Sequence, residues 1–425
     1  MAFSASPAIQ SEAVRPRLNL HPLFFGARNA AGFLKNLDIT PEQDRTLLDA
    51  RKQIRRELRR LSAQPHSLGL DRNLVFDHRA RSVRKRLDDT TFRPRFLTQG
   101  SYAYRTLNAP CRKGQSIDLD DGIYFPMSFI DTVNPELASR AVFELIERAL
   151  ESICRQNQWT IERKPTCVRI HLDAVRTIHI DLPIYAIPDI EFDRLEKALA
   201  QAFGTLQIAQ MQMREAISGI DRSALIDSSR VMLAHRELGW IPSDPQRMND
   251  WVKAQIALHG EGLRRVWRYL KAWRDFQWQD SKLASIHLMA AVSQLYDEHN
   301  DPSAPGPRDD LDVAFVAGRL VRIMARQVTN PVNPNQSFQP LVDDFGNDLL
   351  LRLDQLDVEM YAAIYETGHR GVAIRKLIAQ FGNRVPKDET MVIGALSAPA
   401  PIPRSDLGTV AAMSAIPMVG KATAG

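Results

Sequence analysis

Apolar and polar residues alternate with two different periods along the chain, and the change between the periods predicts two structural halves. Residues 117–120 and 177–185 alternate with a period of two, which is typical of strands with one face against a core. Residues 168–172 alternate in the same way, and with 177–185 they predict an antiparallel hairpin. From about Pro245 the period is helical. We therefore expect an α+β fold, in which an all-helical lobe follows a mixed sheet with helices.

The clearest helix start lies at Thr40, because a threonine cap, a proline at the first helical position and a glutamine three residues after the cap occur together. This helix should run to about Gln64. A strand piece is expected at 160–163. Further helices are predicted at 73–86, 135–156, 192–210, 252–278, 286–299, 311–326, 350–367 and 374–380.

Four domains follow from these elements. Residues 1–39 form an N-terminal segment whose first twenty residues should be disordered or loosely docked. Residues 40–245 form the mixed lobe and 246–395 the helical lobe, with the active site expected in the cleft between them. Residues 396–425 are rich in Ala, Pro, Ser and Gly and predict a flexible tail.

Composition narrows the class of protein. The 425 residues are 44% hydrophobic and 25% charged, which is ordinary for a soluble globular protein. The chain contains no apolar run of about 18 residues and no secretory signal pattern. Three cysteines without CxxC spacing favour reduced thiols and argue against a zinc site. We expect a bacterial cytoplasmic protein that does not bind membranes.

Three aspartates suggest catalysis. Asp118 and Asp120 should share one face of a strand, and Asp181 follows on a later strand. An isolated pair at this spacing would most simply be a solvated turn, but a third carboxylate on a neighbouring strand favours a cage for two Mg²⁺ ions. Gly100 and Ser101 form a tight turn nearby that could offer backbone N–H groups and a hydroxyl to a phosphate.

Several separated stretches resemble one enzyme family. They are PRFLTQGSYAYRTLN, IDLDDGIYFPM, HIDLPIYAIP, LRRVWRYLKAWRDFQW followed by SIHLMAA, and FGNRV at 381–385. In order and spacing they are similar to the cGAS/DncV-like nucleotidyltransferases of bacterial anti-phage (CBASS) signalling, whose catalytic lobe is polymerase-β-like. The resemblance implies a Mg²⁺-dependent synthase that joins ATP and GTP into 3',3'-cyclic GMP–AMP.

The same resemblance implies roles for individual residues. Gly100 and Ser101 would hold the β- and γ-phosphates, and Lys271 and Ser285 the triphosphate of the donor nucleotide. From the pattern alone, a surface lysine at 271 and a helix-capping serine at 285 are the simpler interpretation. Four further residues match positions that contact the nucleotide or its base, namely Gln99, Arg169, Ser243 and Asp244.

A basic block covers residues 51–96, which hold 14 Lys or Arg against 5 Asp or Glu. Arg51, Arg55 and Arg59 are spaced by four residues and should form one row on a helix. The row could be a solvated face or a nucleic-acid surface, but aromatic residues that stack bases are not interleaved with it. The resemblance, which extends to Arg95, implies a regulatory site for a folate-like molecule.

The last residue, Gly425, could be joined to another molecule by a ubiquitin-activating or ubiquitin-conjugating-like partner, as in some relatives. Three other functions stay open at this point. They are a template-independent RNA nucleotidyltransferase, a synthase with a different cyclic product, and a regulatory binding module without catalysis. The sequence does not determine which bases would be joined, what activates the enzyme, or its oligomeric state.

Overall fold

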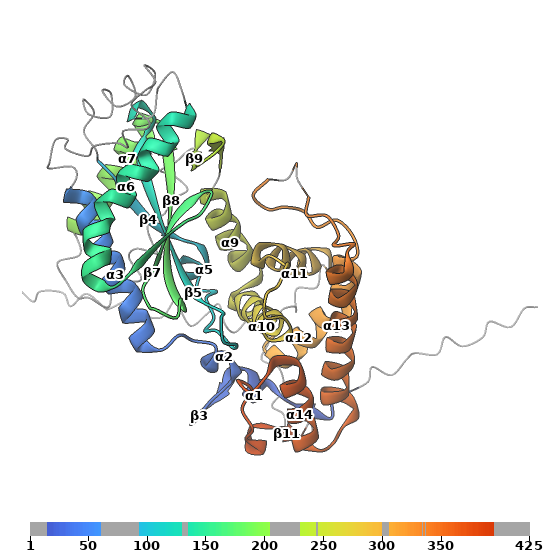
Figure 1. The fold of residues 1–425 in the computed structure, drawn as a ribbon. Coiled ribbons are helices and arrows are strands. Elements are labelled where there is room, and N and C mark those ends of the chain that lie inside the picture. The colour runs from blue at the N-terminus through green and yellow to red at the C-terminus, as the bar shows by residue number, and fades with distance from the viewer. Residues whose placement is uncertain are drawn as a thin grey trace, which may run out of the picture.

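A computed structural model describes residues 15–60, 93–129, 135–204, 230–243, 245–299, 306–333, 335 and 337–394. The helix predicted at 73–86, the tail at 396–425, Asp244 and Gly425 lie outside these residues. The described chain has two halves, a seven-stranded sheet with flanking helices and an all-helical half beside it (Figure 1). The α+β prediction is therefore confirmed, whereas the predicted domain boundaries stay predictions. Within the described residues, no helix is both long enough and apolar enough to cross a membrane.

The sheet is mixed, and its longest strands lie at its centre. Strand β8 pairs in parallel with β5, while all other strand pairs are antiparallel. The predicted hairpin is confirmed as β7 and β8. The strand order is β10-β9-β8-β5-β4, with β7 on β8 and β6 on β7. The strands are β4 Arg95–Gln99, β5 Ile117–Pro126, β6 Thr160–Arg163, β7 Cys167–His171, β8 Ile178–Ile187, β9 Met232–His235 and β10 Gly239–Pro242.

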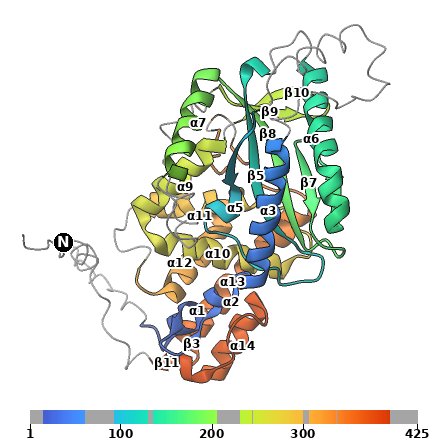
Figure 2. The same ribbon diagram turned by 90° about the vertical axis from the view of Figure 1, so that its left-hand side faces the viewer.

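One face of the sheet carries the core of this half. Ile117, Leu119 and Ile180 are fully buried in one apolar cluster with residues of α3 (Pro41–Arg60) and α6 (Pro135–Asn157). Figures 1 and 2 show these two helices packed along the sheet. Among the described residues, α7 (Asp189–Gly204) covers one end of the opposite face, where Phe192 packs in a small apolar cluster. The remainder of that face is available for polar residues.

Helix α3 begins as predicted. The backbone N–H of Gln43 donates to the Thr40 hydroxyl at 3.1 Å, and the Gln43 side-chain carbonyl accepts from the Thr40 N–H at 2.8 Å. Each side chain thus satisfies one backbone donor that the first helical turn leaves free. This reciprocal cap fixes where α3 starts and hence the angle at which its arginines meet the sheet.

The helical half is built from six main helices around buried aromatic residues such as Trp267 and Trp273. The helical stretch predicted at 252–278 is divided at Gly260, whose φ of 78° is left-handed and suits glycine. A π-helical turn, η5 (Ala362–Glu366), follows the fifth helix. The helices are α9 Pro245–His259, α10 Glu261–Gln277, α11 Ser285–His299, α12 Asp309–Met324, α13 Asp344–Tyr361 and α14 Arg370–Phe381.

The N-terminal segment belongs to this helical half. The prediction of a loosely docked start is wrong for Leu18–Leu20, because these residues are buried. Strand β1 (Leu18–Asn19) pairs with β11 (Ile393–Gly394) near the other end of the described chain. Four short elements follow β1 in the chain: α1 His21–Phe25, β2 Gly26–Ala27, β3 Ala30–Ala31 and α2 Phe33–Asn36. Other short elements lie elsewhere, namely α5 Gly100–Ala103, η3 Met127–Phe129 and η6 Glu389–Met391.

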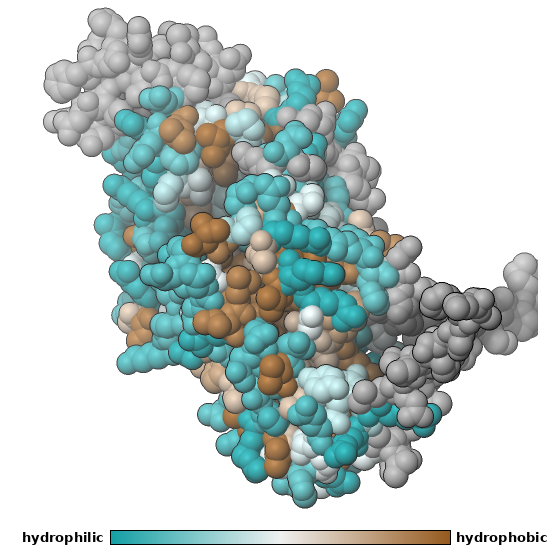
Figure 3. Space-filling model, turned by 90° about the vertical axis from the view of Figure 1, so that its right-hand side faces the viewer, coloured by the Kyte–Doolittle hydropathy of each residue, from teal (hydrophilic) through white to brown (hydrophobic). Residues whose placement is uncertain are grey.

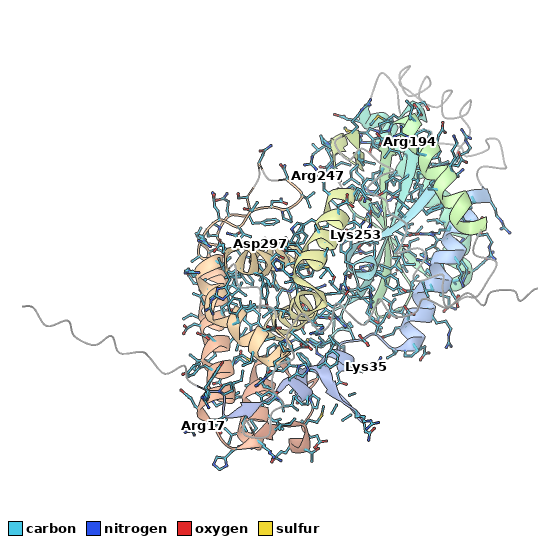
Figure 4. All side chains as sticks on the ribbon, turned by 180° about the vertical axis from the view of Figure 1, so that it is seen from behind. Arg17, Lys35, Arg194, Arg247, Lys253 and Asp297 are labelled. Atoms are coloured by element: carbon cyan, nitrogen blue, oxygen red, sulfur yellow. The ribbon has the colours of Figure 1, made fainter. Side chains whose placement is uncertain are left out.

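Two surface regions of the helical half can be followed in the figures. Seen from behind, α9 runs between them and carries Arg247 and Lys253 (Figure 4). On the far side of the helical half, where α13 lies, apolar residues reach the surface (Figure 3), and Leu351 and Val358 are among the exposed ones. They are seven residues apart and therefore lie on one outward side of α13.

Candidate active site

A cavity of about 720 Å³ lies between the two halves. The sheet half contributes the end of β4, the turn after it and the first part of β5. The helical half contributes α10 and the start of α11. The cavity brings together most of the predicted site residues, with one further cation: Gln99, Gly100, Ser101, Asp118, Asp120, Lys271, Arg274 and Ser285 all line it.

The glycine–serine turn is shaped for close approach. Gly100 has φ of 66°, and a Cβ atom there would lie 1.8 Å from Oδ2 of Asp120. Only glycine allows the turn and this carboxylate to touch. The Ser101 hydroxyl is buried and has no hydrogen-bond partner among the described residues. A buried hydroxyl without a partner is costly, so this one is suited to receive a ligand oxygen.

The three aspartates occupy adjacent places in the sheet. In the β5–β8 pair, Asp120 lies opposite Asp181, and Asp118 lies opposite His179. Neighbouring strands are about 4.8 Å apart, so all three carboxyl groups are within a side chain's reach. Burial, then the charge of Asp118, then that of Asp181 raise the pKa of Asp120 well above its ordinary value. The face therefore carries more negative charge than its surroundings balance, which favours a cation.

Asp181, however, does not line the cavity. It is opposite Arg169 in the β7–β8 pair, and the guanidinium donates to both of its carboxylate oxygens, each at 2.7 Å. Within the described residues, no group of three or more His, Cys, Asp or Glu side chains is arranged to hold a metal ion. The predicted cage is thus present in residue type and register but is not preformed. The oxygen donors and excess negative charge fit Mg²⁺ once Asp181 exchanges its partner.

The opposite wall of the cavity is basic. Lys271 is buried and donates to the Thr106 carbonyl at 2.8 Å. Burial, and next the neighbouring Arg274, lower the pKa of Lys271 to about 8. Arg274 donates to the Ser285 hydroxyl at 2.9 Å. Arg274 is a site residue that was not predicted from the sequence, although its position three residues after Lys271 on a helix places both on one side. Ser285 is the first residue of α11 rather than the cap before it.

The residues predicted to contact the base are dispersed. Gln99 lines the cavity, and its amide donates to the Tyr185 hydroxyl at 2.8 Å. Arg169 is held by Asp181, as described. Ser243 follows β10, and its N–H donates to the Val231 carbonyl at 2.9 Å outside the cavity lining. Asp244 is not among the described residues. Of the three described residues, Gln99 alone lines the cavity.

The arginine row of α3 meets the other face of the sheet. Arg51 is buried and donates to the Thr98 hydroxyl at 2.9 Å. Arg55 donates to Asp121 with two nitrogens, one of them at 2.7 Å from Oδ2. Arg59 lies over the Phe96 ring, 5.2 Å from its centroid. Burial, and then the charge of Arg55, lower the pKa of Arg59, so this surface has an excess of positive charge.

Arg95 lies apart from the row. It pairs with Glu196 of α7 and lies over the Phe192 ring at 5.5 Å. Strand alternation places it on the same side as Gln99, whereas Phe96 and Thr98 face the row. Its pKa is lowered chiefly by burial, with smaller effects from Arg93 and Arg59, so the two basic groups are still electrostatic neighbours across the sheet edge.

A central sheet with paired carboxylates, facing a glycine–serine turn and a basic helical wall, defines a nucleotidyltransferase. The nucleotidyltransferase domain of the family described as "Cyclic GMP-AMP synthase DncV-like" matches residues 94–185, and the cyclic GMP-AMP synthase C-terminal domain matches 260–394. The chain belongs to this family of DncV-like cyclic GMP-AMP synthases.

Curated relatives and solved structures agree. A cyclic GMP-AMP synthase of Vibrio cholerae serotype O1 is 35% identical over 310 residues, which span 71% of this chain and 70% of that protein. One from Escherichia coli is 32% identical over 325 residues, 74% of this chain and 72% of that protein.

Two solved structures of the V. cholerae enzyme DncV are 28% identical to this chain and cover 89% of it and 99% of their own chains. One holds the linear intermediate 5' pppA(3',5')pG and has a TM-score of 0.69. The other holds GTP and 5MTHFGLU2, with a TM-score of 0.71.

Proposed function

We propose that this enzyme joins ATP and GTP into 3',3'-cyclic GMP–AMP, which acts as a second messenger in the cytoplasm of a bacterium that is defending itself against phage (CBASS signalling). The observation that carries the proposal is the cavity, in which the Gly100–Ser101 turn and two carboxylates face Lys271, Arg274 and Ser285. One wall is built for cations and the other for phosphates. The relatives that hold GTP and a linear A–G intermediate supply the substrate class.

Each residue has a physical task in this proposal. Gly100 lets the backbone N–H groups approach the β- and γ-phosphates, and the free Ser101 hydroxyl binds an adjacent oxygen. Lys271 and Ser285 bind the triphosphate from the other side, with Arg274 holding the Ser285 hydroxyl in place. Gln99, Arg169, Ser243 and Asp244 would select the bases.

Asp118, Asp120 and Asp181 would hold two Mg²⁺ ions, with Asp181 leaving Arg169. The ions, when bound, lower the pKa of the attacking 3'-hydroxyl and neutralise charge on the α-phosphate. The protein aligns the two nucleotides, and most of the rate comes from this alignment and from charge complementarity. After the first transfer releases pyrophosphate, the linear product turns over in the site and a second transfer closes the ring.

Two regulatory features complete the proposal. The row of Arg51, Arg55 and Arg59, together with Arg95 across the sheet edge, would bind a folate-like anion that inhibits the enzyme, and the relative that holds 5MTHFGLU2 supports this. Gly425 would be the point at which a ubiquitin-activating or ubiquitin-conjugating-like partner joins the enzyme to a target.

Product analysis tests the synthase activity directly. The protein is incubated with all four NTPs and Mg²⁺, and phosphatase-resistant products are identified by mass spectrometry, with Asp118→Asn as the inactive control. A cyclic A–G dinucleotide is expected. A different cyclic product would revise the base assignment, and extension of added RNA with labelled ATP would replace the proposal with an RNA nucleotidyltransferase.

A further inference from the structure

Arg169 occupies an unusual place in a row of charged residues across three strands. In register, Asp181 of β8 lies opposite Arg169 of β7, and Arg169 lies opposite Glu162 of β6. The guanidinium therefore has a carboxylate neighbour on each side. It is bound to Asp181 through two parallel hydrogen bonds of 2.7 Å, which is the strongest geometry for such a pair.

This pairing conflicts with the use of Asp181 as a metal ligand. A divalent cation at the carboxylate would lie beside a fixed positive charge, and like charges at such distances repel strongly. Both Asp181 oxygens already accept from Arg169, whereas Asp118 and Asp120 line the cavity and have no such clamp among the described residues. The carboxylates are arranged for a cation only if the guanidinium moves.

Glu162 gives the guanidinium a second position. Glu162 is paired with Lys164 at 2.6 Å and with His171 at 2.7 Å, and its side chain is partly exposed. Arg169 is itself partly exposed, with 24% of its side-chain surface accessible, so its movement does not require the core to open. The side chain can turn from one carboxylate to the other, or toward a nucleotide, by rotation alone.

We propose that Arg169 is a positioning residue for Asp181. It pairs with this carboxylate until a divalent cation enters the site. The cation then displaces Arg169, which moves toward Glu162 and the nucleotide. The inference rests on the metal site of the proposed function. Metal binding and nucleotide binding become coupled, because the cation frees the arginine that the nucleotide then meets. Before a cation binds, the Arg169–Asp181 pair also reduces the repulsion among the three adjacent aspartates.

Binding of Mn²⁺ without nucleotide tests this directly, because free Mn²⁺ is counted by electron paramagnetic resonance and no turnover is needed. We compare the full-length wild type with Arg169→Met, which keeps the length but loses the charge, and Arg169→Lys, which keeps the charge but loses the two-pronged geometry. Arg169→Met should bind Mn²⁺ about 10-fold more tightly, as expected when a bound counter-ion is removed. Arg169→Lys should fall between the two. Equal or weaker binding by folded Arg169→Met would overturn the inference.

A matched control and a double mutant sharpen the result. Arg163→Met removes an arginine that pairs with Glu147 at 2.9 Å on the opposite face, and it should leave Mn²⁺ affinity unchanged. Glu162→Gln should weaken Mn²⁺ binding about 3-fold in the wild type and have no effect in Arg169→Met, because Glu162 influences the metal site only through Arg169. An equal effect in both backgrounds would contradict the two-position exchange.

Mn²⁺ binding distinguishes failure of the proposed Arg169 exchange from failure of the proposed function. If the wild type binds Mn²⁺ and Asp181→Asn weakens that binding, the metal site stands whatever the Arg169 variants do. If wild type, Arg169→Met and Asp181→Asn all fail to bind Mn²⁺, with and without GTP, both the metal site and the inference are wrong.

Discussion

Asp120 and Asp121 are consecutive residues on β5, yet they point to opposite faces of the sheet and meet opposite surroundings. Asp120 lies with two other aspartates, and its pKa is raised by burial and by their charges. Asp121 is fully buried but accepts from Arg55 and from the Thr98 hydroxyl at 3.0 Å. One face has too many negative charges, and the other has a row of positive ones around a single carboxylate.

The difference separates a structural charge from a functional one. Asp121 has its own counter-ion within the fold, so it needs no ligand. Asp118 and Asp120 have no counter-ion in the part of the chain that the structure describes. On the other face, Arg51, Arg55 and Arg59 together carry more charge than Asp121 can balance. In the proposed function, unbalanced charge of each sign marks a place where a ligand would bind: cations on one face and an anion on the other.

The largest effect should come from removing a carboxylate on the cation face. Asp118→Ala or Asp181→Ala should lower the rate of product formation at least about 10³-fold, because a lost metal ligand removes several kcal/mol of transition-state stabilisation. Initial rates from purified protein measure this. Asp49→Ala, on the exposed side of α3, is the control and should be fully active. Retained activity in either active-site variant would contradict the metal assignment.

The second prediction is that neutralising Asp121 and neutralising Asp120 have different effects on the free energy of unfolding. Asp121→Asn should lower the free energy of unfolding by about 3 kcal/mol, since it leaves Arg55 and buried Arg51 without a counter-ion. Asp120→Asn should leave the free energy of unfolding unchanged or increase it, because it relieves repulsion among the aspartates. Denaturant titration of the two variants compares them. Equal destabilisation would show that the two faces are electrostatically alike.

The third prediction concerns the anion face. Arg59→Met should raise the half-inhibitory concentration of a folate diglutamate about 10-fold, the usual effect of removing one charged hydrogen bond to a carboxylate. Arg56→Met, a neighbouring arginine on the same helix, serves as control. The measurement is product formation at increasing inhibitor concentration. An unchanged inhibition curve for Arg59→Met would place the inhibitor elsewhere.

The smallest effect is a pH dependence on the phosphate side. The pKa of Lys271 is lowered to about 8, chiefly by burial, so the free enzyme loses this positive charge as the pH rises through 8. Because binding of the triphosphate requires the charged form, kcat/KM for the nucleotide should fall several-fold between pH 7.5 and pH 9. In Lys271→Met the value should be low throughout and nearly flat. A wild-type slope in this variant would assign the titration to another group.

The sequence predicts local features best. The strand pattern around Asp118 and Asp181, the hairpin and the Thr40 cap are set by residues close together in the chain, and all are confirmed. Gly100 is also predictable, because a turn with positive φ at a close approach favours glycine. These features place the sheet side of the cavity, where Gln99, Gly100, Asp118 and Asp120 lie.

Features that depend on distant partners were not predictable. The Arg169–Asp181 pair requires the register of the hairpin, which alternation alone leaves undetermined. Arg274 reaches Ser285 only because α10 and α11 pack together. Leu18–Leu20 are buried by the helical half, which begins more than two hundred residues later. In each case the deciding contact joins segments that the pattern along the chain describes separately.

The pairing of β1 with β11 also has a practical consequence. It brings Leu18 and Gly394 together at the lower end of the helical half, on the side away from the sheet (Figures 1 and 2). A fluorescent label or a surface tether placed beside this two-stranded pairing would lie away from the cavity between the two halves. The β1–β11 pair is thus a suitable attachment site for immobilising the enzyme during an activity assay.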